Sequence, residues 1–275
     1  MSVADHQDDE AGFTALTDKI ARERRFACGS YKDPCLRRRI AVRMRACRTV
    51  SYGAYALHLD THPDEWDRLL KSLTINVTKF FRNRDVFDAI ARTVIPALWS
   101  SPAPSIRVWS AGCASGEEPY SLAILFHLHA ALAGGAASAA RVQILASDID
   151  DASLNAAREG VYGSRAFSET APDIRRAYFS ETEPASIVPG VRALTLFERR
   201  DLVADPAPSG PFGLIVCRNV LIYLDRPTQE RLVAQFHRAL APGGFLVLGK
   251  TETMFGMQRD QFTVLDHRAR VYQRR

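Results

Sequence analysis

Two adjacent glutamates beside a glycine-punctuated turn are the first residues in this sequence that could do chemistry. The stretch Ile106–Pro119 reads IRVWSAGCASGEEP, a short apolar β-prone run followed by a loop with Gly112 and Gly116 and a proline suited to a helix start. This order is typical of a nucleotide-binding strand, turn and helix. Glu117 and Glu118 would repel a phosphate there but attract a ligand with an ammonium, a sulfonium and hydroxyls. An ordinary strand-to-helix turn with surface glutamates is the open alternative.

S-adenosylmethionine carries those groups. The turn is neither GxGxxG nor a P-loop with Lys-Ser/Thr, so it favours neither a dinucleotide nor a triphosphate. One strand later, after the apolar run 142–146, Asp148 stands where a carboxylate could accept both ribose hydroxyls. The alternative for Asp148 is a helix N-cap, although Asp150 or Asp151 could take that role and leave Asp148 for a ligand.

A third polar group follows the apolar run that ends at Cys217. Arg218 and Asn219 interrupt this run, and Tyr223 comes shortly after them. Because ligands of open α/β sheets lie at the carboxyl ends of the strands, these residues are candidates for the same site. Buried Arg and Asn side chains also need partners, so a structural hydrogen-bond network is the alternative.

The elements that must position these residues alternate between strand and helix from residue 106 onward. Apolar runs of strand length alternate with helical periodicity, except over residues 160–200, and 262–266 with 269–273 predict a closing antiparallel pair. We therefore predict an α/β domain over 87–275, Rossmann-like, with a mainly parallel sheet.

The N-terminal part differs in character. We expect a disordered acidic leader over 1–12, an all-helical domain over 13–73 and a linker over 74–86. One predicted helix carries an arginine band opposite its apolar stripe, with no acidic residue between Asp33 and Asp60 to neutralise it. Such a band is either a solvated face or a docking surface for an acidic partner. Its members are Arg37, Arg38, Arg45 and Arg48.

Composition limits the class of protein. The chain has 275 residues, 47% of them hydrophobic and 24% charged, with a modest net charge of +5 that does not by itself imply a nucleic-acid partner. The N-terminus has no apolar signal region, and no run of about 18 apolar residues occurs, so we expect a cytoplasmic protein without membrane insertion. Five cysteines without a CxxC pair predict neither a disulfide framework nor a metal site.

Taken in order, several motifs resemble the CheR family of chemoreceptor glutamate methyltransferases. They are NVTKFFR, VWSAGCASGEEPYS, ASDID, VYG, CRNVLIYL, TQERL, LAPGGFLVLG and the terminal VYQRR. The resemblance covers nearly the whole chain beyond the leader. It implies an S-adenosylmethionine-dependent methyltransferase domain joined to a small all-helical N-terminal domain. The substrates it implies are glutamate side chains in the cytoplasmic signalling domains of chemoreceptors or receptor-like proteins, and the product of the cofactor is S-adenosylhomocysteine.

The same resemblance assigns roles to residues. It places Arg82 and Tyr223 nearest the transferring methyl group, Glu117 at the amino-acid end of the cofactor and Asp148 at the ribose. It also places Asn76, Thr78 and Arg82 against the cofactor or the reaction centre. The other cofactor residues are Gly112 of the glycine loop, Asn219 and Val220 beside the methionyl group, and Asp201 and Leu202 at the adenine. Asp201 replaces the family's usual Asn, and Gly249-Lys250-Thr251-Glu252 replaces Gly-His-Ser-Glu.

The implied reaction needs little from the protein, because a glutamate carboxylate is already ionised at pH 7 and can act without a general base. An RNA methyltransferase and a non-catalytic S-adenosylmethionine-binding adaptor are the alternatives. This sequence lacks the Asn/Asp-Pro-Pro-aromatic motif expected for methylation of an amine, which disfavours an RNA methyltransferase. The intact Arg82 and Tyr223 disfavour the adaptor. Some family members tether to a receptor C-terminal peptide through a β-insert, here about 180–202. Pro184 and Pro189 weaken it as a docking edge, so we expect recognition without the tether.

Overall fold

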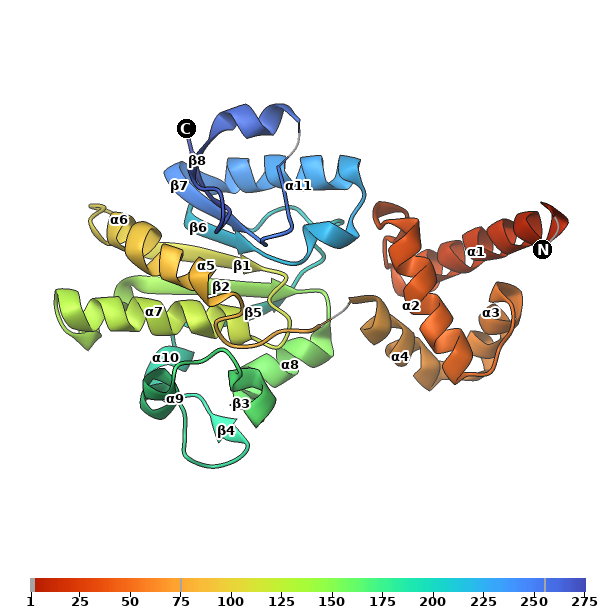
Figure 1. Ribbon diagram of the computed structural model, residues 1–275, viewed down its shortest axis with the longest axis horizontal. Coiled ribbons are helices and arrows are strands. Elements are labelled where there is room, and N and C mark those ends of the chain that lie inside the picture. Colours follow the sequence, from red (N-terminus) through yellow and green to blue (C-terminus); the bar gives the residue numbers. More distant parts are fainter. Residues whose placement is uncertain (1–2, 75, 255) are drawn as a thin grey trace. The chain divides into compact units, whose positions relative to one another are not determined.

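The computed structural model describes residues 3–74, 76–254 and 256–275, which form two compact units (Figure 1). One unit comprises Met1–Ile75 and Tyr223–Thr228, and the other comprises Asn76–Ile222 and Gln229–Arg275. The chain therefore passes between the units three times. Among the described residues, no helix combines the length and the apolar character needed to cross a membrane.

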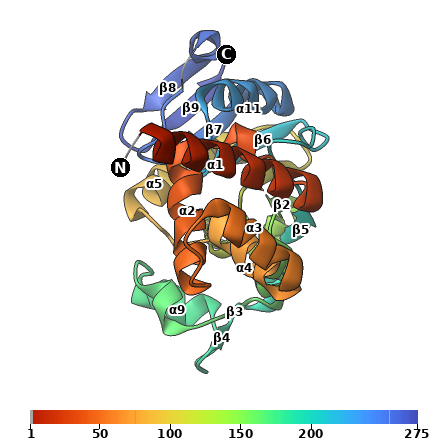
Figure 2. The same ribbon diagram turned by 90° about the vertical axis from the view of Figure 1, so that its right-hand side faces the viewer.

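The first unit is helical (Figure 2). Its elements are α1 (Val3–Arg24), a 3₁₀ turn (Cys28–Ser30), α2 (Asp33–Ala46), α3 (Tyr52–Thr61) and α4 (Pro63–Thr74). Helix α1 packs on α3 and α2 packs on α4, around buried apolar side chains such as Leu16, Ile40 and Trp66. A buried carboxylate joins three helices, because Glu65 accepts hydrogen bonds from the Arg43 guanidinium at 2.9 and 2.7 Å and from the Tyr55 hydroxyl at 2.8 Å.

Helix α1 corrects the expectation of a disordered leader over 1–12, because it begins at Val3. Asp9 and Glu10 of this helix lie 3.8 and 2.6 Å from the Arg37 guanidinium of α2, so these acidic residues take part in the helical unit. The acidic composition that resembled a leader is thus compatible with the start of a helix.

The second unit contains a seven-stranded sheet in the order β5-β2-β1-β6-β7-β9-β8. The first five strands are parallel, while β9 is antiparallel to both of its neighbours. This confirms the predicted mainly parallel sheet with a closing antiparallel pair. The strands are β1 (Ile106–Ala111), β2 (Val142–Asp148), β5 (Thr195–Arg199), β6 (Phe212–Cys217), β7 (Leu240–Leu248), β8 (Phe262–Asp266) and β9 (Val271–Arg274).

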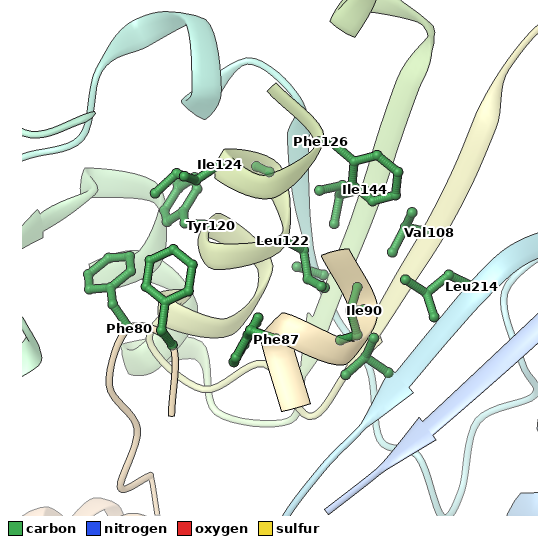
Figure 3. Close-up of a cluster of buried hydrophobic side chains, with 14 of the residues drawn as sticks. Phe80, Phe87, Ile90, Val108, Tyr120, Leu122, Ile124, Phe126, Ile144 and Leu214 are labelled. Carbon is green, nitrogen blue, oxygen red and sulfur yellow. The ribbon is translucent and has the colours of Figure 1, made fainter. Parts of the chain in front are cut away.

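Alternating side chains of the strands meet helices on both faces of the sheet. Val108 joins the cluster of Figure 3 with Phe87 and Leu122 of the helices on one face. The neighbouring Trp109 meets Phe236 of α11 in an edge-to-face contact of 5.4 Å between ring centroids on the other face. Apart from the short helices of the insert described next, the α- and π-helices of this unit are α5 (Arg84–Ala89), a π-helical turn (Ile90–Val94), α6 (Ile95–Trp99), α7 (Glu117–Ala133), α8 (Asp151–Glu159) and most of α11 (Arg226–Ala239).

The β-insert differs from the expected range of 180–202. Thr195–Arg199 forms edge strand β5 of the main sheet, with Phe197 buried and Leu196 exposed, so the alternating pattern belongs to that sheet. Among the described residues, the insert consists of the pair β3 (Val161–Tyr162) and β4 (Ala185–Ser186), with the short helices α9 (Pro172–Tyr178) and α10 (Pro189–Arg192).

The expected linker over 74–86 also differs, because the chain from Asn76 onward belongs to the second unit. Phe80 is fully buried there and stacks on Phe167 with 5.3 Å between ring centroids, and its amide donates to the carbonyl of Ala166. Two adjacent aromatic side chains, Phe80 and Phe81, thus attach this segment to the second unit.

Candidate functional site

The carboxyl ends of β1, β2 and β6 lie side by side at the middle of the sheet. Strand β1 pairs in parallel with β2 on one side and with β6 on the other, so the loops after all three strands leave at the same edge. The chain changes direction across the sheet between β1 and β6, and ligands of open α/β sheets bind at such a switch point. The structure therefore brings together the three groups that the sequence singled out.

The glycine loop after β1 requires its glycines for two different contacts. Gly112 has φ +82°, and a Cβ there would lie 2.5 Å from Cγ2 of Val220, in the loop after β6. Gly116 has φ +94°, and a Cβ there would lie 2.8 Å from the Cβ of Ala157 in α8. The loop thus packs against the loop after β6 on one side and against α8 on the other, and neither contact leaves room for a side chain at these two glycines.

Asp148 is the last residue of β2 and is only 7% exposed. Its carboxylate accepts hydrogen bonds from the amide of Ala114 in the glycine loop at 2.8 Å and from the amide of Asp150 at 3.0 Å. Burial raises the pKa of Asp148. The N-cap of α8 is Asp150, whose side chain accepts from the amide of Ala152, so Asp148 is not needed for that role.

Glu117 and Glu118 begin α7 in different surroundings. Glu117 is 5% exposed, its carboxylate accepts a hydrogen bond from the Ser115 hydroxyl at 2.8 Å, and burial raises its pKa. In the described part of the chain, no lysine or arginine forms an ion pair with Glu117. Glu118 instead lies 3.3 Å from the Arg218 guanidinium and accepts from Ser110 at 2.8 Å. A buried carboxylate without a counter-charge suits the ammonium group of a ligand.

The loop after β6 is held by a residue that the sequence reasoning left without a role. The carboxylate of Glu252 is 3% exposed and accepts from the amides of Asn219, Val220 and Ile222 at 3.1, 2.9 and 3.3 Å, and from that of Gly249. Burial raises its pKa, while these four amides oppose the rise. Asn219 has φ +60°, a conformation that this anchoring helps to hold. The signal in the sequence was Gly249-Lys250-Thr251-Glu252 after β7, which keeps the Gly and the Glu of the family's Gly-His-Ser-Glu.

Asp201 and Leu202, proposed at the adenine, follow β5 and are both buried. One carboxylate oxygen of Asp201, Oδ1, accepts from the amides of Val203 and Ala204 at 2.8 and 3.3 Å. Asp201 therefore shapes its own turn, and its second oxygen, Oδ2, can still serve as an acceptor for an exocyclic amine.

Three predicted residues precede α5 in the second unit. The Asn76 amide donates to the Asp150 carboxylate and to the Ser153 hydroxyl, which attaches it to the start of α8. Thr78 is partly buried. The Arg82 guanidinium donates to the Val77 carbonyl at 2.8 Å and is otherwise partly exposed.

Tyr223 belongs to the helical unit rather than to the unit that holds Arg82. Its carbonyl accepts from the amide of Lys32 at 2.9 Å, Leu224 forms a bridge with Tyr31, and the amide of Asp225 donates to Ser30. The pairing of Tyr223 with Arg82 at one reaction centre therefore stays a prediction.

Only part of the arginine band predicted for α2 is free of an ion pair within the described part of the chain. Arg37 forms an ion pair with Glu10 at 2.6 Å, and its guanidinium lies 3.7 Å from the ring centroid of Phe13. The sequence had offered no neutralising acid within the helix, but α1 supplies one. Arg38 and Arg45 of α2 are exposed. Arg48 is exposed too, but it follows the end of α2 at Ala46 and has φ +56°, so it does not extend the band along the helix as expected. In the described residues, no group of three or more His, Cys, Asp or Glu side chains could hold a metal ion.

The chain is similar to known proteins over most of its length. The family model described as "CheR methyltransferase, SAM binding domain" matches residues 76–271, and "CheR methyltransferase, all-alpha domain" matches residues 11–74. The chain is 34% identical over 246 residues to the chemotaxis protein methyltransferase of Listeria monocytogenes, covering 89% of this chain and 91% of that protein. It is 31% identical over 263 residues to the Escherichia coli chemotaxis protein methyltransferase, covering 93% and 88%.

The fold, the strand-end carboxylates and these matches define an S-adenosylmethionine-dependent methyltransferase. The resemblance seen in the motifs is thereby confirmed. The chain belongs to the CheR methyltransferase family.

Proposed function

We propose that this protein transfers methyl groups to glutamate side chains in the cytoplasmic domains of chemoreceptors. Membership of the family supports this substrate class, and the relatives above are named for chemotaxis. The observation that carries the proposal is the buried, uncompensated carboxylate of Glu117 beside the glycine loop, since it suits a cationic amino-acid nucleoside and would repel a phosphate.

The residues of the site would divide the cofactor among them. Glu117 would hold the amino group, Asp148 the ribose, Asp201 and Leu202 the adenine, and Asn219 and Val220 the methionyl part. Gly112, Asn76 and Thr78 would line the same site. When bound, S-adenosylmethionine supplies a methyl group on a positively charged sulfur.

The chain's own residues would orient the substrate. A glutamate carboxylate is ionised at pH 7, because its ordinary pKa is about 4.3, so it needs no base. None of the seven histidines lies in the loops after β1, β2 or β6. Arg82 and Tyr223 would position the carboxylate. A contact with Arg82 that positions the substrate without fully neutralising it would preserve its nucleophilicity.

The partner would be recognised by charge. Arg38 and Arg45 of α2, with Arg48 just beyond its end, present an exposed basic surface, which we call the basic face of α2. Chemoreceptor signalling domains would offer it glutamates. We propose that this face, and not a C-terminal receptor peptide, carries most of the recognition. The setting of such a reaction is the cytoplasm.

The test is transfer of labelled methyl from S-adenosylmethionine to a purified receptor cytoplasmic fragment. A glutamyl methyl ester releases its label as volatile methanol in mild alkali, whereas methylated nucleic acid or amine retains it. A receptor fragment with its methylatable glutamates changed to alanine is the matched control. Alkali-stable label in RNA would overturn the proposal in favour of an RNA methyltransferase, and tight cofactor binding without transfer to any receptor would favour an adaptor.

A further inference from the structure

A buried guanidinium lies beneath the segment that carries Arg82. The side chain of Arg218, directly after β6, is 2% exposed, and a buried charge is costly unless it is paired and hydrogen-bonded. Its closest contact is not with a carboxylate: Nη2 donates to the backbone carbonyl of Arg82 at 2.7 Å and to Oδ1 of Asn83 at 3.0 Å. The Glu118 carboxylate lies farther away, at 3.3 Å from Nη1.

Other contacts fix Arg218 in place. Its guanidinium lies 5.3 Å from the ring centroid of Phe87 in α5, and Glu118 is itself held by the Ser110 hydroxyl at the end of β1. Arg218 thereby joins the end of β6, the first turn of α7 and the segment before α5. All of these residues belong to the second unit.

The segment that Arg218 contacts has an unusual backbone. Phe81 has φ +55° and Asn83 has φ +61°, a region that residues other than glycine rarely adopt without support. The amide of Phe81 donates to the Ser121 hydroxyl at 3.0 Å, and that of Asn83 donates to the Glu169 carboxylate at 2.6 Å. Arg218 supports the same segment at a carbonyl, because its guanidinium donates to the carbonyl of Arg82, which lies between Phe81 and Asn83.

We infer that Arg218 is a positioning residue, which fixes the main chain at Arg82 and so determines where the Arg82 guanidinium meets the substrate carboxylate. This inference rests on the proposed role of Arg82 in methyl transfer. Glu118 supports it by balancing the buried charge. Lysine cannot replace Arg218, because a single ammonium on a narrower head cannot reach the Arg82 carbonyl, Asn83 and Glu118 together.

The test compares R218K with R107K in the full-length protein. Arg107 is a less buried match near the amino end of β1, away from the strand-end loops, since its guanidinium also donates to a carbonyl, that of Ser209 at 2.8 Å, and lies 4.7 Å from the Phe212 ring centroid. R218K should lower kcat by about 10- to 100-fold at saturating substrates, as expected for a displaced orienting group. Its affinity for S-adenosylhomocysteine should stay close to that of the wild type, and R107K should change neither quantity.

Hydrogen exchange provides a readout that does not depend on turnover. In R218K the amides of Phe81 and Asn83 should exchange faster, while those of β1 stay protected; E118Q, which keeps Arg218 but removes its counter-charge, should show a weaker form of the same pattern. Unchanged exchange at 81–83 in R218K, or loss of kcat only in proportion to lost cofactor affinity, would overturn the inference. If the wild type fails to methylate receptors, the proposed function fails, and the exchange measurement still decides whether Arg218 fixes this segment.

Discussion

Burial raises the pKa of both neighbouring glutamates, Glu117 and Glu118, but only Glu118 also balances a buried guanidinium, that of Arg218. The pKa of Glu117 is raised by burial, so the folded protein binds its proton more tightly than the unfolded chain does. Its charge therefore opposes folding at neutral pH, and this opposition is relieved as the pH falls through the raised pKa. Residues that destabilise the free protein in this way are typical of ligand sites.

We predict that E117Q raises the melting temperature of the cofactor-free protein while it weakens cofactor binding. Removal of the buried charge should raise the melting temperature by about 2–4 °C, which corresponds to about 1 kcal/mol for a domain of this size. E118Q is the matched control and should lower the melting temperature, because it leaves the Arg218 cation uncompensated. Calorimetric scans and titrations with S-adenosylhomocysteine test both variants. Equal destabilisation by the two changes would contradict the distinction.

The second prediction at this scale concerns Arg82 and Tyr223. Replacing either with alanine should lower kcat far more than cofactor affinity, because both are proposed to orient the substrate and not the cofactor. The measurement is the methyl-transfer rate at saturating substrates together with a calorimetric titration. If the rate in both variants falls only as far as cofactor binding falls, the orienting role is wrong.

At the scale of elements, Glu252 controls the loop after β6 from a position 33 residues beyond Asn219. In E252Q an NH2 group would replace one carboxylate oxygen, so the backbone N–H groups that now donate to that oxygen would face another donor. Each backbone N–H left unpaired costs about 1–3 kcal/mol of stability. We predict a cofactor affinity lower by about tenfold or more. D266N is the control, since Asp266 likewise accepts from two backbone amides, those of Arg268 and Ala269, but in the β8–β9 turn. Equal affinity in E252Q and D266N would show that the loop does not depend on Glu252.

What the sequence could predict follows from the range over which residues act. The glycine loop, Asp148 and the Asn219 turn lie at strand ends, where hydrophobic period and turn residues mark them locally. The role of Glu252 and the contact of Arg218 with the Arg82 carbonyl depend on hydrogen bonds between segments far apart in the sequence. The spacing of hydrophobic residues along the chain does not predict such contacts. The neutralisation of Arg37 by Glu10 was missed for the same reason: its acid comes from another helix. Roles of the individual cofactor residues came from the family resemblance and remain predictions.

At the scale of the whole molecule, charge on the basic face of α2 should govern how receptors are engaged. Arg38 and Arg45 lie two helical turns apart, on one side of α2. We predict that R38E/R45E raises the KM for a receptor fragment, with kcat and cofactor affinity unchanged. Raising the salt from about 0.01 to 0.1 M shortens the screening length from about 30 to 10 Å and should raise the wild-type KM as well.

The control for this variant is R22E/R68E, which reverses two exposed arginines on α1 and α4 of the same unit. Its KM should stay near the wild-type value. A wild-type enzyme that is indifferent to salt and to the α2 reversals, yet loses activity when the receptor's C-terminal peptide is deleted, would show that a tether carries recognition.

The division of the chain has a consequence for building hybrid enzymes. Tyr223–Thr228 lies between two segments of the methyltransferase unit in sequence, yet it folds with the helical unit, to which the amide of Lys32 and the bridge at Tyr31 attach it. The helical unit is therefore not a detachable module. A chimera that exchanges receptor preference by grafting only the N-terminal 75 residues would join foreign helices to a native 223–228 segment. Grafting both segments together keeps their shared contacts intact, so the six residues 223–228 must travel with the N-terminal helices.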